Sequence, residues 1–386
     1  MIRVAILGST GSVGRSTLDV IQRHPNRFEV VALAANQAVE LLAEQVRKHK
    51  PGVAVLSKEN GLGRRDDLPP ARWSEGREAL LEITEAPNVD VVVNAMVGSA
   101  GLEPTLRTLK AGKRLALANK ESLVAGGRLV VEAAEEGGGE LIPVDSEHSA
   151  ILQCLEGYEM SAVSRLVLTA SGGPFRGWSR EQLQDVPPSR ALNHPTWAMG
   201  AKITVDSATL ANKALEVIEA HFLYGIDYDS LGVVVHPQSI VHSFVEFVDG
   251  SVLAQLGFPT MELPILYAMS YPERVPDGVL QTFDPVKASP LVFEEVDRDT
   301  FTLFSLGERA GREGGTSPAV YNAANEVAVE AYLKEDLQFP GMGEIVSEAL
   351  DRLGGKPVSN LENVLEVDKE AREVSRELIR LLKRKA

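Results

Sequence analysis

A glycine-rich turn close to the N-terminus constrains the fold of this chain more than any other feature. The sequence Gly8-Ser-Thr-Gly11-Ser-Val-Gly14 follows an apolar stretch at residues 4–7 and precedes the apolar spacing of a helix at 13–23. Glycines there permit a tight turn and a close approach of the backbone to a pyrophosphate, whose charge the N-terminus of the helix attracts. The spacing is GxxGxxG instead of the commoner GxGxxG, so the alternative is an ordinary glycine turn.

Short apolar stretches alternate with helical patterns over the first 145 residues. We expect strands at residues 4–7, 29–34, 53–56, 89–94, 114–117 and 141–144, and helices at 13–23, 40–48 and 103–111. Repeated alternation of this kind predicts a parallel sheet covered by helices on both faces. The expected fold class is therefore α/β, with a Rossmann-like, dinucleotide-binding domain at residues 1–145.

The pattern changes after residue 145. Strands expected at 165–169, 232–235 and 241–247, with a hairpin at Asp249-Gly250 and helices between them, predict a central α/β domain at 146–270. Its segment 172–201 is rich in Gly, Pro, Trp and Ser. A loop of this length is usually a binding loop, a lid or disordered, and we expect a flexible flap at about 185–201.

The last third of the chain reads as helical. Prolines at 272, 276, 285 and 290 predict an extended linker over residues 271–298. Helices expected at 317–333 and 361–382 then predict a C-terminal helical domain at 299–386.

Charge and cysteine content exclude several classes of protein. The formal net charge of −15 argues against nucleic acid as a partner, because a phosphate backbone needs a basic face. Cys154 is the only cysteine, so an intrachain disulfide and a cysteine-based zinc site are excluded. The sequence has no stretch of about 18 apolar residues and begins a strand almost at once, which favours a cytoplasmic protein with no membrane partner.

The end of the second expected strand bears on the choice of dinucleotide. Folds that prefer NAD usually place an acid there to bind the ribose 2′-hydroxyl. Here the stretch is Leu33-Ala34-Ala35-Asn36-Gln37, without an acid, which leaves room for a 2′-phosphate and favours NADPH. The stretch contains no Arg or Lys to pair with that phosphate, but Asn36 and Gln37 could donate hydrogen bonds to it.

Three carboxylates are candidates for a metal site. Asp145-Ser146-Glu147 ends an expected strand, and alternation along an extended chain would put Asp145 and Glu147 on the same side. Glu216 would share a helix face with Asn212, four residues before it. Converging carboxylates with open positions suit Mg²⁺ or Mn²⁺, which prefer hard oxygen ligands. The alternative is a set of capping and surface acids.

Hydrogen-bond donors are expected near these acids. Lys120, in Asn119-Lys120-Glu121-Ser122, follows a strand at the carboxyl edge of the sheet, where ligands bind in open α/β sheets. The alternative is a surface lysine. Ser171 lies in a turn of small residues that suits an anion. Further donors would complete a phosphate site in this acidic chain: Ser207, Asn212 and Lys213.

The expected flap carries His194, Trp197 and Met199. A Trp and a Met in a polar loop need an apolar surface to cover, and a substrate with a nicotinamide would provide one while the flap excludes water. The alternative is that both pack into the core. His194 would donate to a phosphate or cap a turn. Other histidines are expected to be structural: His148, His236 and His242.

Motifs spread over the whole chain support one assignment. They are Gly8–Gly14, Ala95–Gly98, Ala118–Ser122, Pro143–His148, Ser171–Phe175, His194–Trp197, Val205–Thr209 with Asn212, Lys213 and Glu216, His236–Ser239 and Tyr321–Glu326. In this order they resemble the 1-deoxy-D-xylulose 5-phosphate reductoisomerase family. The resemblance implies a homodimer with a nucleotide-binding, a central catalytic and a C-terminal helical domain. The chain departs from some family members at Gln37, where they have a basic residue.

The resemblance also implies a role for each candidate residue. Asp145, Glu147 and Glu216 resemble the metal ligands and, with Lys120, the catalytic set. Lys120, Ser146 and Glu147 would surround the ketose oxygens. The substrate and its phosphate would be bound by Ser171, His194, Ser207, Asn212, Lys213 and Glu216. NADPH would contact Thr10, Gly11, Ser12, Val13, Asn36, Asn119, Glu121 and Gly200. The flap would include Trp197 and Met199.

The implied reaction converts 1-deoxy-D-xylulose 5-phosphate to 2-C-methyl-D-erythritol 4-phosphate, an isoprenoid precursor, with NADPH and Mn²⁺, Mg²⁺ or Co²⁺. The metal would chelate the carbonyl and a neighbouring hydroxyl, the carbon skeleton would rearrange by cleavage and re-addition, and NADPH would reduce the resulting aldehyde.

Two other functions fit the same motifs. A metal-dependent oxidative decarboxylase of a hydroxy acid would want an arginine for the substrate carboxylate, and Arg176 is the only one in these motifs. A non-catalytic NADP-binding protein would need neither the third carboxylate nor the flap.

Overall fold

Two sheets organise the chain, one in each of two compact units. The computed structural model describes residues 1–63, 67–197 and 199–384. Unit 1 consists of Met1–Ser122, Arg128–Ser149 and Thr260–Leu280, and unit 2 of Leu123–Gly127, Ala150–Pro259 and Gln281–Ala386.

The sheet of unit 1 has seven parallel strands in the order β4-β3-β2-β1-β5-β6-β7. They are β1 (Ile2–Leu7), β2 (Phe28–Ala35), β3 (Val53–Leu56), β4 (Arg72–Glu75), β5 (Val91–Asn94), β6 (Arg114–Leu117) and β7 (Glu140–Pro143). The central strands are apolar and buried on both faces, as parallel sheets require, because the crossover helices cover both sides. The predicted Rossmann-like sheet is confirmed.

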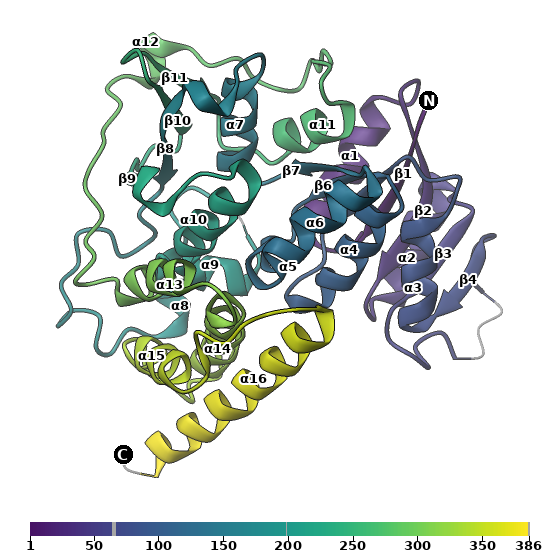
Figure 1. The fold of residues 1–386 in the computed structure, drawn as a ribbon. Helices are drawn as coiled ribbons and strands as arrows, with labels where there is room; N and C mark the ends of the chain where they lie inside the picture. The colour runs from purple at the N-terminus through teal and green to yellow at the C-terminus, as the bar shows by residue number, and fades with distance from the viewer. Residues whose placement is uncertain (64–66, 198, 385–386) are drawn as a thin grey trace. The chain divides into compact units, whose positions relative to one another are not determined.

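Helices connect these strands (Figure 1). They are α1 (Ser12–Arg23), α2 (Val39–His49), α3 (Gly76–Glu85), α4 (Leu102–Lys110), the start of α5 (Lys120–Gly126), α6 (Arg128–Gly137), the start of α7 (Ser146–Leu155) and α11 (Glu262–Ser270), with a 3₁₀ turn at Ser99–Gly101. Right-handed crossovers place α1 and α2 on one face and α3, α4 and α6 on the other.

Helix α11 returns to unit 1 from far along the sequence. It packs against α1, and Arg23 of α1 forms ion pairs of 2.8 Å with both Glu262 and Asp277. The side chain of Asp277 is almost fully buried. Burial by itself would raise the pKa of this carboxyl group, but hydrogen bonds from the Val279 amide and from Arg23 outweigh burial and lower the pKa. Pairing stabilises such a buried carboxylate only while both partners remain.

The sheet of unit 2 has four strands in the order β11-β10-β8-β9. They are β8 (Val163–Ala170), β9 (Leu231–Val235), β10 (Val241–Phe247) and β11 (Val252–Leu256). β10 runs antiparallel to β8 and β11, whereas β8 and β9 are parallel. The hairpin predicted at Asp249-Gly250 joins β10 to β11, with Gly250 at φ +87°.

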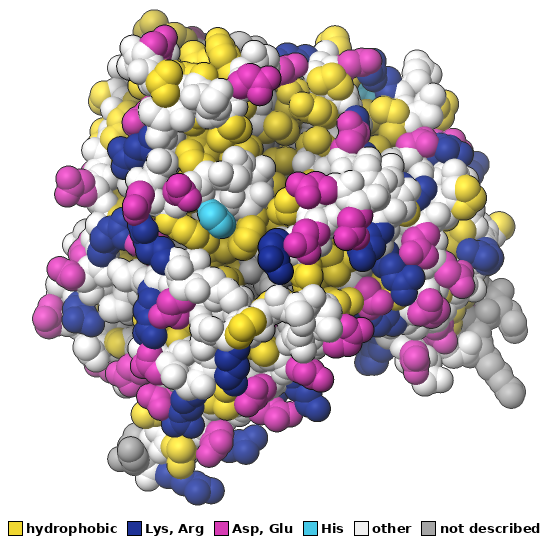
Figure 2. All heavy atoms as spheres, viewed as in Figure 1, with side chains coloured by type: hydrophobic (Ala, Val, Ile, Leu, Met, Phe, Trp, Pro, Cys, Tyr) yellow, Lys and Arg dark blue, Asp and Glu magenta, His cyan; other side chains and the backbone are white. Residues whose placement is uncertain are grey.

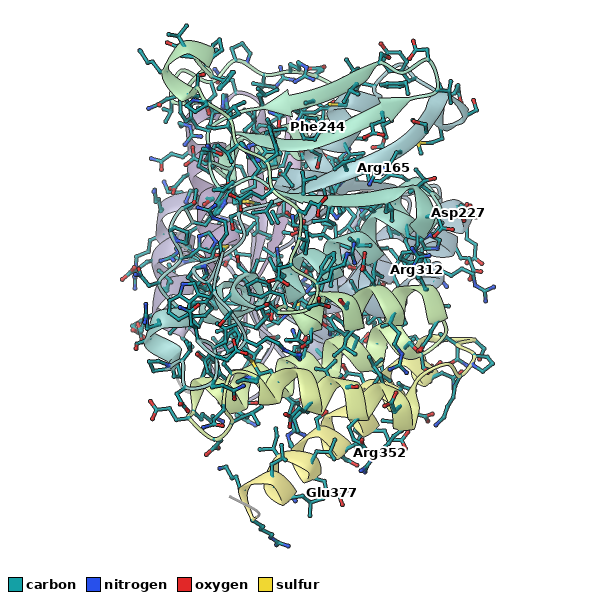
Figure 3. All side chains as sticks on the ribbon, turned by 90° about the vertical axis from the view of Figure 1, so that its left-hand side faces the viewer. Arg165, Asp227, Phe244, Arg312, Arg352 and Glu377 are labelled. Atoms are coloured by element: carbon teal, nitrogen blue, oxygen red, sulfur yellow. The ribbon has the colours of Figure 1, made fainter. Side chains whose placement is uncertain are left out.

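The rest of unit 2 is mainly helical. Its helices are the remainder of α5 and α7, α8 (Pro188–Ala191), α9 (Ala201–Ala208), α10 (Ala211–Tyr224), α12 (Pro285–Ala288), α13 (Thr302–Glu313), α14 (Ser317–Leu333), α15 (Gly341–Leu353) and α16 (Leu361–Lys383), with 3₁₀ turns at Met160–Ala162 and Tyr228–Ser230. Figure 3 shows Arg165 and Phe244 on the sheet, and Arg312, Arg352 and Glu377 on α13, α15 and α16. α14 is buried along almost its whole length, because α13, α15 and α16 pack around it.

The described surface is charged, and acidic side chains outnumber basic ones in the sequence. On the face drawn in Figure 2, acidic and basic side chains are interspersed. Within residues 1–63, 67–197 and 199–384, no helix combines the length and the apolar character that crossing a membrane requires.

Candidate active site

The glycine turn of unit 1 has a geometry that only glycine allows at two of its positions. Gly8 has φ +84°, and a Cβ there would lie 2.4 Å from the Ala95 carbonyl oxygen. A Cβ on Gly14 would lie 2.3 Å from the Gly8 carbonyl oxygen. The turn therefore folds tightly against the end of β1, and α1 begins at Ser12 with Gly11 as its N-cap. Its amide groups at the carboxyl edge of the sheet form an anion site of the dinucleotide-binding type.

Asn119 and Glu121 lie at the same edge, just after β6. Asn119 is fully buried, and its Nδ2 donates to the carbonyls of Met96 and Gly98 and to Glu121 Oε2, each at 3.0 Å. Both side chains thus fix the loop that follows β5. Asn36 lies at the end of β2 and is exposed.

Lys120 begins α5 and is buried, with 6% of its surface exposed. Its ammonium forms an ion pair with Asp145. The alternative of a surface lysine is wrong. A buried lysine needs a partner for its charge, and Asp145, which lies between β7 and α7, provides the carboxylate.

The predicted geometry of Asp145 and Glu147 requires a correction. The strand β7 ends at Pro143, and α7 begins at Ser146, so Glu147 lies in the first turn of a helix and not on an extended chain. The Asp145 carbonyl accepts the Ser149 amide at 2.8 Å, which starts the helix. Alternation along a strand therefore does not place these two carboxylates. The acid of Glu147 instead complements the helix dipole, and Ser146 Oγ donates to it.

A cluster of neutral donors lies in unit 2 around His194. Ser171 follows β8, and Ser207 lies on α9. His194 Nε2 lies 3.0 Å from Ser171 Oγ and 3.1 Å from Ser207 Oγ. His194 Nδ1 accepts the backbone amides of Trp197 at 2.9 Å and Thr196 at 3.1 Å. Because Nδ1 is an acceptor, the ring proton is on Nε2, which faces the two hydroxyls.

The pKa of His194 is lowered from its usual value, because burial disfavours the charged ring. A proton on Nδ1 would also oppose the two amide donors. We expect imidazole NMR signals of the ligand-free protein, assigned by comparison with His194→Gln, to titrate below the ordinary histidine value of about 6.5. The protein then loses stability as the pH falls from 6.5 toward the folded pKa, since only the unfolded chain takes up the proton there. A midpoint at or above 6.5 would contradict the buried, neutral ring.

Asn212, Lys213 and Glu216 share one face of α10. Glu216 is fully buried, and its two carboxylate oxygens accept from Asn212 Nδ2 and Lys213 Nζ. The prediction that Asn212 and Glu216 share a helix face is confirmed, and the two side chains are hydrogen-bonded to each other. Lys213 is 3% exposed, so this ion pair is buried, and buried ion pairs rarely add stability over apolar residues. A functional reason for keeping them is therefore expected.

The flap residues Trp197 and Met199 are both partly exposed. The alternative that they pack into the core is wrong. Gly200 is the N-cap of α9, and its carbonyl accepts Thr204 Oγ1 at 2.8 Å, so the flap segment ends where a regular helix begins. The helix α8 lies within the predicted loop, and Arg176 forms an ion pair with Glu294.

Sequence reasoning missed a buried carboxylate beside this cluster. Asp206 is 1% exposed and precedes Ser207. It pairs with Lys202 at 2.8 Å and accepts Asn325 Nδ2 at 2.8 Å from α14. The signal available in the sequence was an acid inside the motif that supplies Ser207. Nothing in the sequence indicates that Asn325, 119 residues later, is its partner.

Known proteins resemble this chain over its whole length. The reductoisomerase of Chloroherpeton thalassium is 48% identical over 375 residues, which cover 96% of this chain and 97% of that one. A crystal structure of DOX-P reductoisomerase in complex with NADPH, fosmidomycin and magnesium has a TM-score of 0.93 and 40% identity, and covers 99% of both chains. The enzyme from Zymomonas mobilis in complex with NADPH has a TM-score of 0.89 at 40% identity, and covers 98% of this chain and 99% of that one.

The glycine turn at the carboxyl edge of a parallel sheet, with the buried Lys120 and Glu121 at the same edge, defines a dinucleotide-dependent α/β enzyme. Models of 1-deoxy-D-xylulose 5-phosphate reductoisomerase, of its C-terminal domain and of the DXP reductoisomerase C-terminal domain match residues 4–127, 141–224 and 256–374. The chain belongs to the 1-deoxy-D-xylulose 5-phosphate reductoisomerase family. The predicted resemblance is confirmed, and the two other functions considered from the sequence are set aside.

Proposed function

We propose that the candidate site residues described above carry out the reaction of the family. This reaction converts 1-deoxy-D-xylulose 5-phosphate to 2-C-methyl-D-erythritol 4-phosphate with NADPH and a divalent cation. The chain is an NADPH-dependent oxidoreductase. The assignment of residues rests on the acidic set Asp145, Glu147 and Glu216, whose carboxylates we propose to hold one metal ion.

The donor chemistry of these acids fits a hard cation. All three offer carboxylate oxygens, and Mg²⁺ and Mn²⁺ are bound by a few carboxylates with positions left for substrate oxygens. Asp145 and Glu216 each already carry a compensating ammonium, from Lys120 and Lys213. When bound, the cation would supply Lewis-acid chemistry at the substrate carbonyl and a neighbouring hydroxyl.

The residues around the acids would bind the ketose. Lys120, Ser146 and Glu147 would hold its oxygens, with the buried Lys120 as a proton donor or acceptor at Nζ. Ser171, His194, Ser207, Asn212 and Lys213 would bind the phosphate. Support comes from the His194 tautomer, since Nε2–H and two hydroxyls form a group of neutral donors for an anion.

NADPH would lie on the glycine turn and supply the hydride that reduces the rearranged aldehyde. Thr10, Gly11, Ser12 and Val13 would contact its pyrophosphate through the amides at the start of α1. Asn36, Asn119, Glu121 and Gly200 would complete the contacts. Trp197 and Met199 would cover the substrate when the flap closes and exclude water from the reaction.

The proposal includes the oligomeric state of the protein and its location in the cell. Exposed apolar side chains lie on the edge strand β11 and the preceding turn, Val248 at 69%, Val252 at 53% and Leu253 at 38%. An exposed apolar edge strand suits pairing with another chain, so we propose a homodimer. We place it in the cytoplasm, because a chain with a single cysteine cannot form an intrachain disulfide and does not depend on an oxidising compartment.

The test is NADPH oxidation, followed at its nicotinamide absorbance, with deoxyxylulose phosphate as substrate. We expect turnover that requires the ketose phosphate, stops when a chelator removes the metal, and returns when Mn²⁺ or Mg²⁺ is added in excess. NADPH binding should persist in the chelator. Turnover that continues in the chelator would contradict the metal-dependent function.

A further inference from the structure

Gln37 leaves this chain without a cation at the end of β2, where a 2′-phosphate of NADPH is expected. In the structure, a cation reaches the end of β2 from the turn after the neighbouring strand β3. We infer that Lys58, in the turn after β3, is the residue that pairs with the 2′-phosphate and sets the preference of this chain for NADPH over NADH. The inference rests on the proposed placement of the dinucleotide on the glycine turn.

The backbone fixes the position of Lys58. The parallel pairing of β2 with β3 continues beyond the last residues of both strands, because the Ser57 amide donates to the Ala35 carbonyl at 2.9 Å and the Lys58 amide to the Asn36 carbonyl at 3.1 Å. These bonds hold Ser57 and Lys58 beside the two residues that follow β2. In a parallel sheet the carboxyl ends of neighbouring strands lie at the same edge.

The side chains of Ser57 and Lys58 also contact the two residues that follow β2. Ser57 Oγ donates to Asn36 Oδ1 at 3.3 Å, and Lys58 Nζ donates to Gln37 Oε1 at 3.3 Å. Three donor types therefore gather at one place: an ammonium, a hydroxyl and two amides. This is the set of groups that a phosphate monoester accepts from.

The charge of Lys58 is available to a ligand. Its bond to Gln37 is long, exposed and made to a neutral oxygen. No carboxylate within the described residues pairs with this ammonium. A doubly charged phosphate would replace the amide oxygen, because charge-assisted hydrogen bonds are shorter and stronger than neutral ones. Gln37 and Asn36 could then donate through their amide nitrogens.

The test compares two nucleotides that differ only in the 2′-phosphate. The dissociation constants of NADPH and NADH are measured by nucleotide fluorescence for the full chain and for Lys58→Gln. We expect Lys58→Gln to weaken NADPH binding roughly 10-fold or more and NADH binding less than about twofold. Lys58→Glu should weaken NADPH further. The NADPH dissociation constant should also depend less on salt in both variants, since one phosphate contact is lost.

The control is Lys48→Gln, which removes an exposed lysine from the last turn of α2 in the same unit. It should leave both dissociation constants unchanged. Unchanged NADPH binding in Lys58→Gln would overturn the inference about Lys58 but not the NADPH assignment. An equal loss of affinity for both nucleotides would also overturn it, because it would indicate a structural role for Lys58. A wild-type chain that binds NADPH and NADH equally would overturn the NADPH assignment as well.

Discussion

Replacing Glu216 by Gln is expected to lower turnover by about 10³-fold or more, which corresponds to about 4 kcal/mol of barrier. The amide keeps the shape of the side chain and can still accept from Lys213, but it removes the negative charge that a metal requires. Glu216 is fully buried on α10, so no solvent-exposed acid can replace it. The measurement is NADPH oxidation with deoxyxylulose phosphate at saturating Mn²⁺.

Two readouts separate a lost metal ligand from a damaged fold. NADPH binding should survive in Glu216→Gln, because the glycine turn belongs to unit 1 and Glu216 to unit 2. The control Glu366→Gln changes an exposed acid of α16 and should keep full turnover. Near-normal activity of Glu216→Gln would remove Glu216 from the metal site.

Replacing Lys120 by Met should have the second-largest effect. We expect it to lower turnover without raising the concentration of metal that the enzyme requires. Turnover should fall about 10²–10³-fold, because the proposed proton-transfer and ketose-binding group is lost. The concentration of Mn²⁺ needed for half-maximal activity should not rise, and we expect it to fall. The reason is that the Lys120 ammonium pairs with Asp145 and competes with a cation for that carboxylate.

The opposite pattern would contradict this account. If Lys120 only held Asp145 in place for the metal, Lys120→Met would raise the Mn²⁺ requirement and excess metal would restore turnover. Thermal unfolding belongs in the same experiment, because removing one partner of a buried pair costs about 3–5 kcal/mol. The control is Lys110→Met, an exposed lysine of α4, which should change none of these quantities.

The alternation of strands and helices in unit 1 could be predicted from the sequence because most of its parallel strands contain a short apolar stretch. The strands 53–56 and 114–117 have the predicted bounds. The short strand β4 and the helix α3 were not predicted. β4, Arg72–Glu75, is an edge strand with polar side chains, so hydrophobic patterning carries no signal for it.

The site residues were accessible from the sequence to different degrees. The Asn212–Glu216 pairing follows from helical spacing alone. The local geometry of Asp145 and Glu147 did not follow, because a helix that starts at Ser146 looks like the end of a strand when only apolar spacing is read. The proximity of Lys58 to Gln37 depends on which strands are neighbours, and that is set by the register of β2 and β3.

Asp206, the neighbour of Ser207 in the sequence, is connected by polar contacts to the far end of the polypeptide. Its partner Asn325 is adjacent in sequence to Glu326, and Glu326 binds Arg372 of the last helix at 2.7 Å. Two polar contacts, each followed by a neighbour in the sequence, thus lead from Arg372 to Ser207, which we propose binds the phosphate. We therefore expect substitutions of Asn325 or Arg372 to weaken binding of the sugar phosphate without contacting it, because they loosen the support of Asp206 beside Ser207.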